Sequence, residues 1–376
     1  MTIRSFRQRS PEVALPPIVI LQSDDWGRVG VRDREGWHEL RAAGVALGEK
    51  PYDYYSLETA DDLAAIRAVL NRHRDSTGRV PCLVMNFCVA NLDFPKILDS
   101  NFQSLYLRPL AEGLPGNWSR PGLLGEYQQG INEGVFYPAL HGTTHACRFA
   151  LERRLREDSS RGELLRTLLR ADTPYIYWRM PWIGFEYWDR DDRNQFLRAE
   201  AQLKLIQEAA QGFKQLFGVG PRSACAPGYR ANDDTREAWK ACGVRVAQNG
   251  PGGLLRPQID ESGLLHTYRT VEIEPALDPA HYTVGRCVEQ AVRCLDHGIP
   301  AIVSLHSINF HSTLRDFRTP TLRVLDQFLA ALEQRYADLL YLHDLDLYEL
   351  IAGQSANRKD LAQTEPVASA AGRGGV

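Results

Sequence analysis

The sequence lacks several features that would define other classes of protein. Its seven cysteines are an odd number with no paired CxxC spacing, so a disulfide framework is not indicated. No apolar run approaches the roughly 18 to 20 residues that cross a membrane. The first apolar run is broken by Pro16 and Pro17 and covers only 18–21, which is too short for a secretory signal. We therefore expect a cytoplasmic protein without a transmembrane segment.

An excess of one charge, internal repeats and linkers are also missing. The net charge is −3, the pI is near 6.4 and the basic residues are scattered, so the chain has no electrostatic footprint for nucleic acid. No Pro-, Gly- or Ser-rich linker precedes the last part of the 376 residues. We expect one domain over 1–353 with an aromatic-rich insertion near 171–192, followed by a disordered tail over 354–376.

The alternation of apolar runs suggests strands and helices in turn. Helices are predicted over 57–74, 193–217, 284–297 and about 320–336, and strands over 82–87, 244–247, 268–273, 301–305 and 339–342. Strands that alternate with helices favour a mostly parallel sheet. In a barrel of this kind the carboxyl ends of the strands gather at one end, where active sites form.

Two short polar clusters, far apart in the sequence, are the most informative feature present. Ser23–Gly27 reads Ser-Asp-Asp-Trp-Gly and His141–His145 reads His-Gly-Thr-Thr-His. Each follows an apolar run, 18–21 or 135–140, that is typical of a buried strand. Carboxylates and imidazoles at strand ends suit a divalent metal site that keeps a spare carboxylate for proton transfer. The pattern predicts hydrolysis.

The residue types fit specific roles. A catalytic zinc site has three protein ligands and a water, and Asp25, His141 and His145 make such a set. The His-x-x-x-His spacing predicts a helical turn, in which residues i and i+4 share one face. Asp24 is then the candidate base for the attacking water. Taken singly, an Asp that caps a turn or a His satisfied in the core explains each motif as well.

Four motifs, in this order, carry a family resemblance. The chain resembles a divergent branch of the polysaccharide deacetylases, of the carbohydrate esterase family 4 type, over roughly residues 15–345. The motifs are Asp24-Asp25, His141-x-x-x-His145, Pro227-Gly228-Tyr229 and Ser304-Leu305-His306. The resemblance implies an α/β fold, a distorted (β/α) barrel of about seven parallel strands. It also implies that a metal-activated water removes an N-acyl group from a sugar, with zinc or another divalent transition metal as the cofactor.

The resemblance also implies a role for each matching residue. Asp24 corresponds to the general base, and the backbone amide of Tyr229 to the oxyanion donor. His306 corresponds to the general acid, and its position directly after a strand supports that reading; His311 is the alternative. The implied metal ligands are Asp25, His141 and His145.

One departure concerns an arginine. The family carries an Arg two residues before the Pro of its third motif, where it braces the catalytic Asp, but this chain has Cys225. We expect Arg230, from the same loop, to take over that role, with Arg222 as the alternative. The missing Arg also leaves open a non-catalytic saccharide binder on a degenerate scaffold.

Candidate substrate contacts come from three places in the sequence. Residues 175–188 concentrate aromatic side chains, of which Trp178 and Trp182 are the candidates for stacking on a sugar; a homo-oligomer interface is the alternative for this stretch. Trp26 could wall the pocket or be structural. Asn86 could bind sugar hydroxyls or satisfy a turn.

These observations lead to one expectation about function. We expect a metal-dependent N-deacetylase that acts on an N-acetylated sugar precursor in surface-polysaccharide biosynthesis, with no nucleic-acid partner. Because the metal chemistry does not depend on what carries the acyl group, a hydrolase of a formamide or cyclic imide is the alternative.

Overall fold

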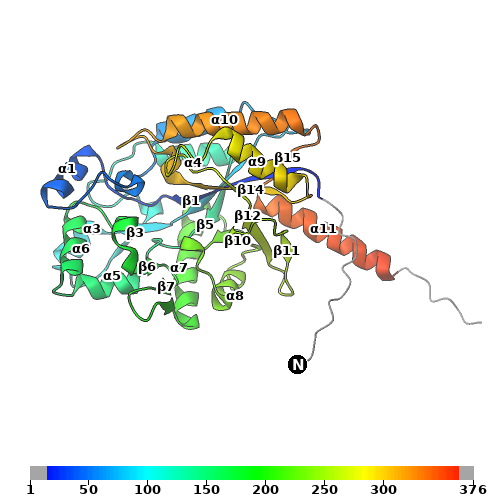
Figure 1. Ribbon diagram of the computed structural model, residues 1–376. Helices are drawn as coiled ribbons and strands as arrows, with labels where there is room; N and C mark the ends of the chain where they lie inside the picture. Colours follow the sequence, from blue (N-terminus) through cyan, green and yellow to red (C-terminus); the bar gives the residue numbers. More distant parts are fainter. Residues whose placement is uncertain (1–14, 364–376) are drawn as a thin grey trace, which may run out of the picture.

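The computed structural model describes residues 15–363 (Figure 1). Its centre is a sheet whose strands lie in the order β11-β12-β10-β9-β5-β2-β1-β14-β13, and β15 pairs with β1. The pairings are parallel except between β11 and β12. The strands are β1 (Ile18–Trp26), β2 (Leu83–Phe87), β5 (Phe136–Leu140), β9 (Ser223–Cys225), β10 (Val246–Pro251), β11 (Gln258–Ile259), β12 (Leu265–Arg269), β13 (Val271–Glu272), β14 (Ala301–His306) and β15 (Leu340–Tyr341).

The sheet closes on itself through one segment. Only Thr270 separates β12, which pairs with β10, from β13, which pairs with β14. Thr270 also joins the two sides, because its N–H donates to the Ile302 carbonyl and its hydroxyl accepts from the Ile302 N–H, both at 2.9 Å. With β12 and β13 counted as one strand, β1, β2, β5, β9, β10, β12–β13 and β14 form the ring. The expected distorted (β/α) barrel is confirmed.

The alternation of side chains along β1 determines what reaches the inside of the barrel. All nine residues of β1 are buried, as expected for a parallel strand covered on both faces. Ile18 and Ile20 belong to the apolar cluster inside the barrel, whereas Val19 and Leu21 pack in the cluster under the helices. Side chains alternate along a strand, so the interior positions continue upward from Ile20 through the even-numbered residues to Asp24.

Helices cover the outside of the barrel (Figure 1). α9 packs on α10 along one side, and α7 packs on α8 on another. In the described residues no helix is long and apolar enough to cross a membrane. The helices are α1 (Arg34–Ala42), α2 (Ala60–Leu70), α3 (Phe94–Asp99), α4 (Leu123–Asn132), α5 (Arg148–Leu155), α6 (Ser160–Arg170), α7 (Ala199–Phe217), α8 (Asp233–Ala241), α9 (Val284–Leu295), α10 (Arg318–Arg335) and α11 (Asp344–Gln363).

Two small sheets lie outside the barrel. β3 (Ala90–Leu92) pairs with β4 (Leu107–Pro109). The aromatic-rich stretch forms a second small sheet from β6 (Gly184–Phe185), β7 (Trp188–Asp189) and β8 (Gln195–Phe196). Because β8 occupies 195–196, the helix predicted from 193 begins only at Ala199.

The end of the chain differs from the expectation. α11 runs through 354–363, where a disordered tail was predicted, and 364–376 lie outside the described residues. The reason lies in the residue types, because 354–363 contains good helix formers and neither Pro nor Gly.

Candidate metal centre and active site

Three predicted metal ligands meet at the carboxyl ends of β1 and β5. Asp25 has a left-handed backbone conformation, φ 75°, and the pairing of β1 with β2 shifts register between Ser23 and Trp26. This irregularity interrupts the alternation, so Asp25 faces the same cavity as Asp24. His141 and His145 come from the loop after β5, and the ligand atoms of the three side chains lie within 4.8 Å of one another.

The distances suit a small divalent ion. Asp25 Oδ1 lies 3.2 Å from His145 Nε2 and 3.6 Å from His141 Nε2. Zinc bonds of about 2.0 to 2.2 Å in tetrahedral geometry separate ligand atoms by roughly 3.3 to 3.6 Å. Asp25 Oδ1 is buried and has no hydrogen-bond partner, an expensive arrangement for a carboxylate oxygen. The three residues therefore fit a divalent cation.

Contacts behind the imidazoles favour the protonation state that a metal needs. His141 Nδ1 lies 2.9 Å from the Cys225 carbonyl, which can only accept, so Nδ1 carries a hydrogen and Nε2 is the nitrogen that faces Asp25. His145 Nδ1 lies 2.6 Å from the Tyr175 hydroxyl. Burial lowers the pKa of His145 well below its ordinary value, which keeps the ring neutral.

Arg28 holds the carboxylate ligand from the other side. Its guanidinium donates to Asp25 Oδ2 at 3.2 Å and to the Tyr175 hydroxyl at 2.7 Å. Burial alone would raise the pKa of Asp25, but Arg28 and His145 hold it well below the ordinary value. Asp25 is therefore ionised, with Oδ2 engaged and Oδ1 left for an ion.

The two histidines do not share a helical turn, so that part of the prediction is wrong. Residues 141–145 form a loop in which Gly142 has φ 92° and His145 φ 74°. The buried Glu186 carboxylate shapes this loop by accepting the N–H groups of Thr143, Thr144 and His145 at 2.9 to 3.0 Å. A Cβ at position 142 would come within 3.1 Å of that carboxylate, so glycine is required there.

This arrangement makes Glu186 a positioning residue for the metal site. Replacing it with Ala removes the acceptor of three backbone N–H groups and should weaken zinc binding about 10- to 100-fold, because the loop that aims His145 is no longer held. A competition titration against a chromogenic chelator measures this. Glu186→Gln, which keeps one acceptor oxygen, should lose less; equal zinc affinity in Glu186→Ala and the wild type would contradict this role.

Asp24 lies beside the metal ligands and is braced by an arginine that the sequence analysis missed. Arg269 on β12 donates to Asp24 Oδ1 at 2.6 Å, and Asn86 donates to the same oxygen at 2.7 Å. Burial alone would raise the pKa of Asp24, but Arg269, with His141 and His306, lowers it. Asp24 is thus ionised at neutral pH and has Oδ2 available to accept a proton.

The expectation for the bracing arginine was therefore wrong. Arg230 lies over the Trp188 ring at 4.2 Å and lines the mouth of the cavity, and Arg222 lies at the other end of the barrel. The third-motif loop points Arg230 outward, whereas alternation along β12 points Arg269 inward, where its side chain is fully buried. The small Cys225 thiol, 3.7 Å from Arg269 Nη2, leaves room for the guanidinium.

His306 lies opposite Asp24 on the neighbouring strand. The two residues are register partners of β14 and β1, and His306 Nε2 is 3.9 Å from Asp24 Oδ2. Its Nδ1 is 2.6 Å from Glu274 Oε1. Burial lowers the pKa of His306, but Glu274, together with Asp24 and Asp25, raises it to about 9. His311, the alternative acid, is buried away from the cavity between Glu58 and Ser56.

The raised pKa predicts how activity depends on pH. His306 is protonated below about pH 9 and can act as an acid there, so kcat should fall as the pH rises through that value. In Glu274→Gln the falling limb should move from about 9 toward the ordinary value of 6.5, because burial is then opposed by Asp24 and Asp25 without Glu274. A kcat–pH profile of both proteins tests this; an unmoved limb would contradict the assignment of His306 as the acid.

The cavity beside these groups has a volume of about 440 Å³ and an aromatic wall. Of the predicted substrate contacts, Trp178 lines it, is 42% exposed and packs on Tyr52. The described lining comprises Asp24, Asp25, Tyr52, His141, His145, Tyr177, Trp178, Phe185, Trp188, Arg190, Gly228, Tyr229, Arg230, Leu277 and His306.

Three other predicted contacts lie elsewhere. Trp26 is fully buried and stacks on Phe310, because it follows Asp25 on the side of β1 that faces the helices. Asn86 is fully buried behind Asp24, since it sits inside the barrel below the cavity. Trp182 packs against the outer core and under Arg161. None of the three lines the cavity, so each prediction as a direct substrate contact is corrected.

Tyr229 lines the cavity, but its backbone amide is already used. The N–H donates to the Ala226 carbonyl at 2.8 Å within the turn Pro227–Tyr229. The turn places Gly228 and Tyr229 in left-handed conformations, φ 59° and 57°. The expected oxyanion donor is thus engaged inside the loop, so that prediction is corrected.

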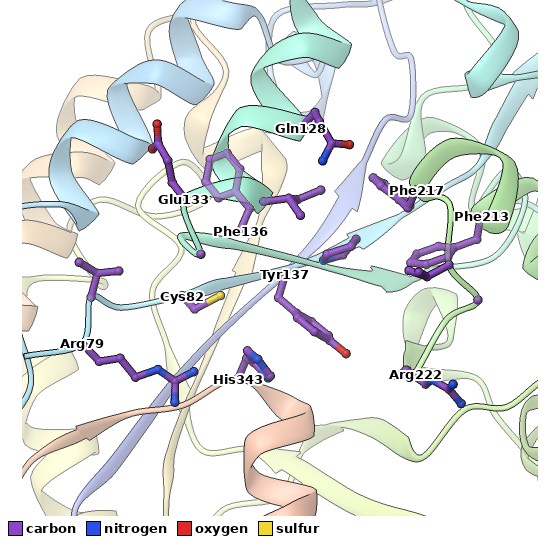
Figure 2. A pocket seen from close by; sticks show the side chains of 16 residues that line it. Arg79, Cys82, Gln128, Glu133, Phe136, Tyr137, Phe213, Phe217, Arg222 and His343 are labelled. Atoms are coloured by element: carbon purple, nitrogen blue, oxygen red, sulfur yellow. The ribbon is translucent and has the colours of Figure 1, made fainter. Parts of the chain in front are cut away.

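A second cavity, of about 460 Å³, lies at the amino-terminal ends of the strands (Figure 2). Arg79, Tyr137, Arg222 and His343 line it together with apolar side chains. In residues 15–363, two groups of side chains could hold a metal ion, Asp25-His141-His145 and Asp24-His141-Cys225, and neither includes a residue of this cavity. Both clusters lie at the other end of the barrel, at the carboxyl ends of the strands.

Comparisons with known proteins found likenesses only among solved structures. No protein-family model and no curated protein matches the chain. A "putative polysaccharide deacetylase" from Mycobacterium smegmatis is 10% identical, with 94% of this chain and 96% of that chain covered and a TM-score of 0.48. Peptidoglycan deacetylase from Bacillus subtilis is 10% identical, covers 93% and 98%, and has a TM-score of 0.38. A family 4 carbohydrate esterase from Streptomyces lividans is 11% identical, covers 87% and 92%, and has a TM-score of 0.36.

Proposed function

We propose that this protein is a metal-dependent N-deacetylase that hydrolyses the acetamide of an N-acetylated sugar precursor, in the biosynthesis of a surface polysaccharide. One observation carries the proposal: Asp24 and His306 lie side by side, 3.9 Å apart, in the wall of a cavity that is also lined by Asp25, His141 and His145. A base, an acid and a metal-ligand set around one cavity are the parts that amide hydrolysis requires.

Each protein group has a defined task in this reaction. A divalent ion held by Asp25, His141 and His145 supplies Lewis acidity and makes water more acidic. Asp24 accepts the proton of the attacking water at Oδ2, because Oδ1 is engaged by Arg269 and Asn86. His306 gives its Nε2 proton to the departing amine nitrogen. Water adds to the acyl carbon, the C–N bond breaks, and acetate and an amine are formed.

The lining of the cavity supports a sugar as the substrate. Tyr52, Tyr177 and Trp178 line the cavity with aromatic side chains, on which the C–H faces of a sugar ring can stack. A small formamide or cyclic imide would leave most of this wall uncovered. All seven cysteines are free, which supports a reducing compartment and a substrate made inside the cell.

Removing the metal tests the proposal. Treatment with dipicolinate should abolish acetate release from N-acetylglucosamine derivatives, and adding back zinc should restore it, because the ion supplies the acidity of the water. Acetate is measured by a coupled enzymatic assay, and residual metal by mass spectrometry. A panel that includes a formamide and a cyclic imide distinguishes the acyl carriers. Full turnover by protein shown to be free of metal would contradict the proposal.

A further inference from the structure

Two arginines stand at the mouth of the catalytic cavity without a role in the proposed chemistry. Arg190 follows β7, and Arg230 follows the turn Pro227–Tyr229. Both are exposed and both line the cavity. Throughout the described part of the chain, no carboxylate lies within ion-pairing distance of either guanidinium. Their charges therefore face the cavity mouth unneutralised.

Packing fixes the position of Arg230. Its guanidinium carbon lies 4.2 Å from the centre of the Trp188 ring, and Trp188 stacks on Phe185 at 6.2 Å. Phe185 in turn presses on Gly228, where a Cβ would come within 2.4 Å of the ring. The β6–β7 hairpin and the loop that carries Arg230 are thus packed together as one wall. An arginine stacked in this way loses less side-chain entropy when it binds a ligand.

Arg190 is restrained on the same wall. Its Nη1 donates to the Pro181 carbonyl at 3.3 Å, and its backbone and Cβ pack closely against Gly184. This contact uses one N–H of the guanidinium group, and the other N–H groups remain free to bind a ligand. Both cations therefore belong to the aromatic wall rather than to mobile surface side chains.

The carboxylates of the cavity cannot neutralise this wall. Among residues 15–363, Asp24 and Asp25 are the only acidic residues that line it, and each already has its own buried arginine, Arg269 and Arg28 respectively. A metal ion would add further positive charge. An uncharged sugar does not neutralise this positive charge. An anionic group is attracted by it and can also form charge-assisted hydrogen bonds with the guanidinium groups.

We propose that Arg190 and Arg230 form a subsite for an anionic group, a phosphate or a carboxylate, carried by the acylated substrate. The inference rests on the proposed function and narrows its substrate class from N-acetylated sugars to anionic ones. A planar guanidinium binds both groups through paired N–H donors, so either chemistry suits the site. A neutral polysaccharide chain is then a poor substrate.

The test compares matched substrates. Acetate release by the holoenzyme is measured with N-acetylglucosamine, N-acetylglucosamine 1-phosphate and N-acetylmuramic acid, which carry no anion, a phosphate and a carboxylate. The wild type should favour at least one anionic compound about 10- to 100-fold in kcat/KM, as expected for charge-assisted hydrogen bonds. In the double variant Arg190→Gln/Arg230→Gln that ratio should fall to near one. Arg230→Lys, which keeps the charge without the planar fork, should give an intermediate ratio.

Control variants distinguish recognition of the anionic group from a structural effect of the arginine substitutions. Arg323→Gln, an exposed arginine on α10, should keep the wild-type ratio. If Arg230 only supports Trp188, its variants will lower kcat/KM for neutral and anionic sugars alike and leave the ratio unchanged, which overturns the proposal. Equal use of neutral and anionic sugars by the wild type also overturns it.

Failure of the anionic subsite can be distinguished from failure of the proposed deacetylase function. If the wild type releases no acetate from any of the three sugars, deacetylation of such sugars is refuted, but calorimetric Kd values for the same compounds still decide the subsite. Tighter binding of an anionic sugar that is lost in the double variant supports the subsite. Equal Kd values for all three sugars overturn it.

Discussion

Replacing Asp24 with Asn is expected to lower kcat about 10²- to 10⁴-fold while the metal stays bound. The amide matches the carboxylate in shape, and its oxygen can still accept from Arg269 and Asn86. What it loses is the basic Oδ2 that faces His306. The measurements are kcat for acetate release and the metal content of the same sample.

A control variant and the metal content distinguish loss of the general base from loss of the metal site. Asp99→Asn, at an exposed position at the end of α3, should leave both kcat and metal content at the wild-type level. If Asp24→Asn keeps more than about a tenth of the wild-type kcat, Asp24 is not the base. If it loses the metal as well, Asp24 is a ligand, and the division of roles between Asp24 and Asp25 is wrong.

Replacing Arg269 with Met should have the largest effect on stability. The arginine side chain is fully buried and contacts Asp24 at 2.6 Å and both Gln22 and Ser304 at 3.2 Å. Removing one partner of a buried ion pair costs about 3 to 5 kcal/mol, because the other charge is left unpaired. We expect the free energy of unfolding to fall by that amount in a urea titration. The pKa of Asp24 should rise, because burial then acts without the guanidinium.

A double-mutant cycle shows whether the pair is the cause. Asp24→Asn combined with Arg269→Met removes both charges, so the double variant should be more stable than the sum of the two single losses predicts. Arg323→Met should change the free energy of unfolding by less than about 0.5 kcal/mol. Strictly additive losses would show that Arg269 acts through its other contacts rather than through Asp24.

Arg269 belongs to a polar network that fills the barrel below the active site. Gln248 donates to the Asn86 side-chain oxygen and to Asp344, at 2.9 and 2.7 Å, and Gln22 donates to Asp344 at 2.7 Å. Burial raises the pKa of Asp344, but three side-chain donors keep it satisfied. The interior of the barrel is therefore apolar at one end and hydrogen-bonded toward Asp24, which explains how a buried arginine is tolerated.

The sequence alone allowed part of the site to be predicted. Apolar strands followed directly by Asp24 and by His306 place both side chains at the carboxyl end of a parallel barrel, and pairing of β1 with β14 makes them neighbours. The positions of Asp25 and the two histidines at strand ends also brought these three residues together, although Asp25 faces the cavity only because the alternation is interrupted after Asp24. Side-chain alternation follows from the local sequence, and strand order follows from the fold. These predictions therefore needed no knowledge of side-chain contacts.

The supporting residues could not be predicted, because each comes from a distant segment. Arg269 reaches Asp24 only because the barrel closes through β12 and β13; its one local signal is that it continues the buried alternation from Leu265 and Thr267. Glu186 is the one acidic residue in the aromatic stretch, which hinted at a buried role. The errors at Trp26 and Arg230 share a cause, since Trp26 follows the irregularity at the end of β1 and Arg230 lies in a loop, and the direction of a side chain at such places does not follow from its position in the sequence.

Zinc titration into metal-free protein, followed by calorimetry, tests the central claim most directly. The wild type should bind one ion per chain, and His145→Ala should lose that site, while His297→Ala, at an exposed position just after α9, should keep it. Absence of a stoichiometric site in the wild type, or unchanged binding in His145→Ala, would contradict a cation held by Asp25, His141 and His145.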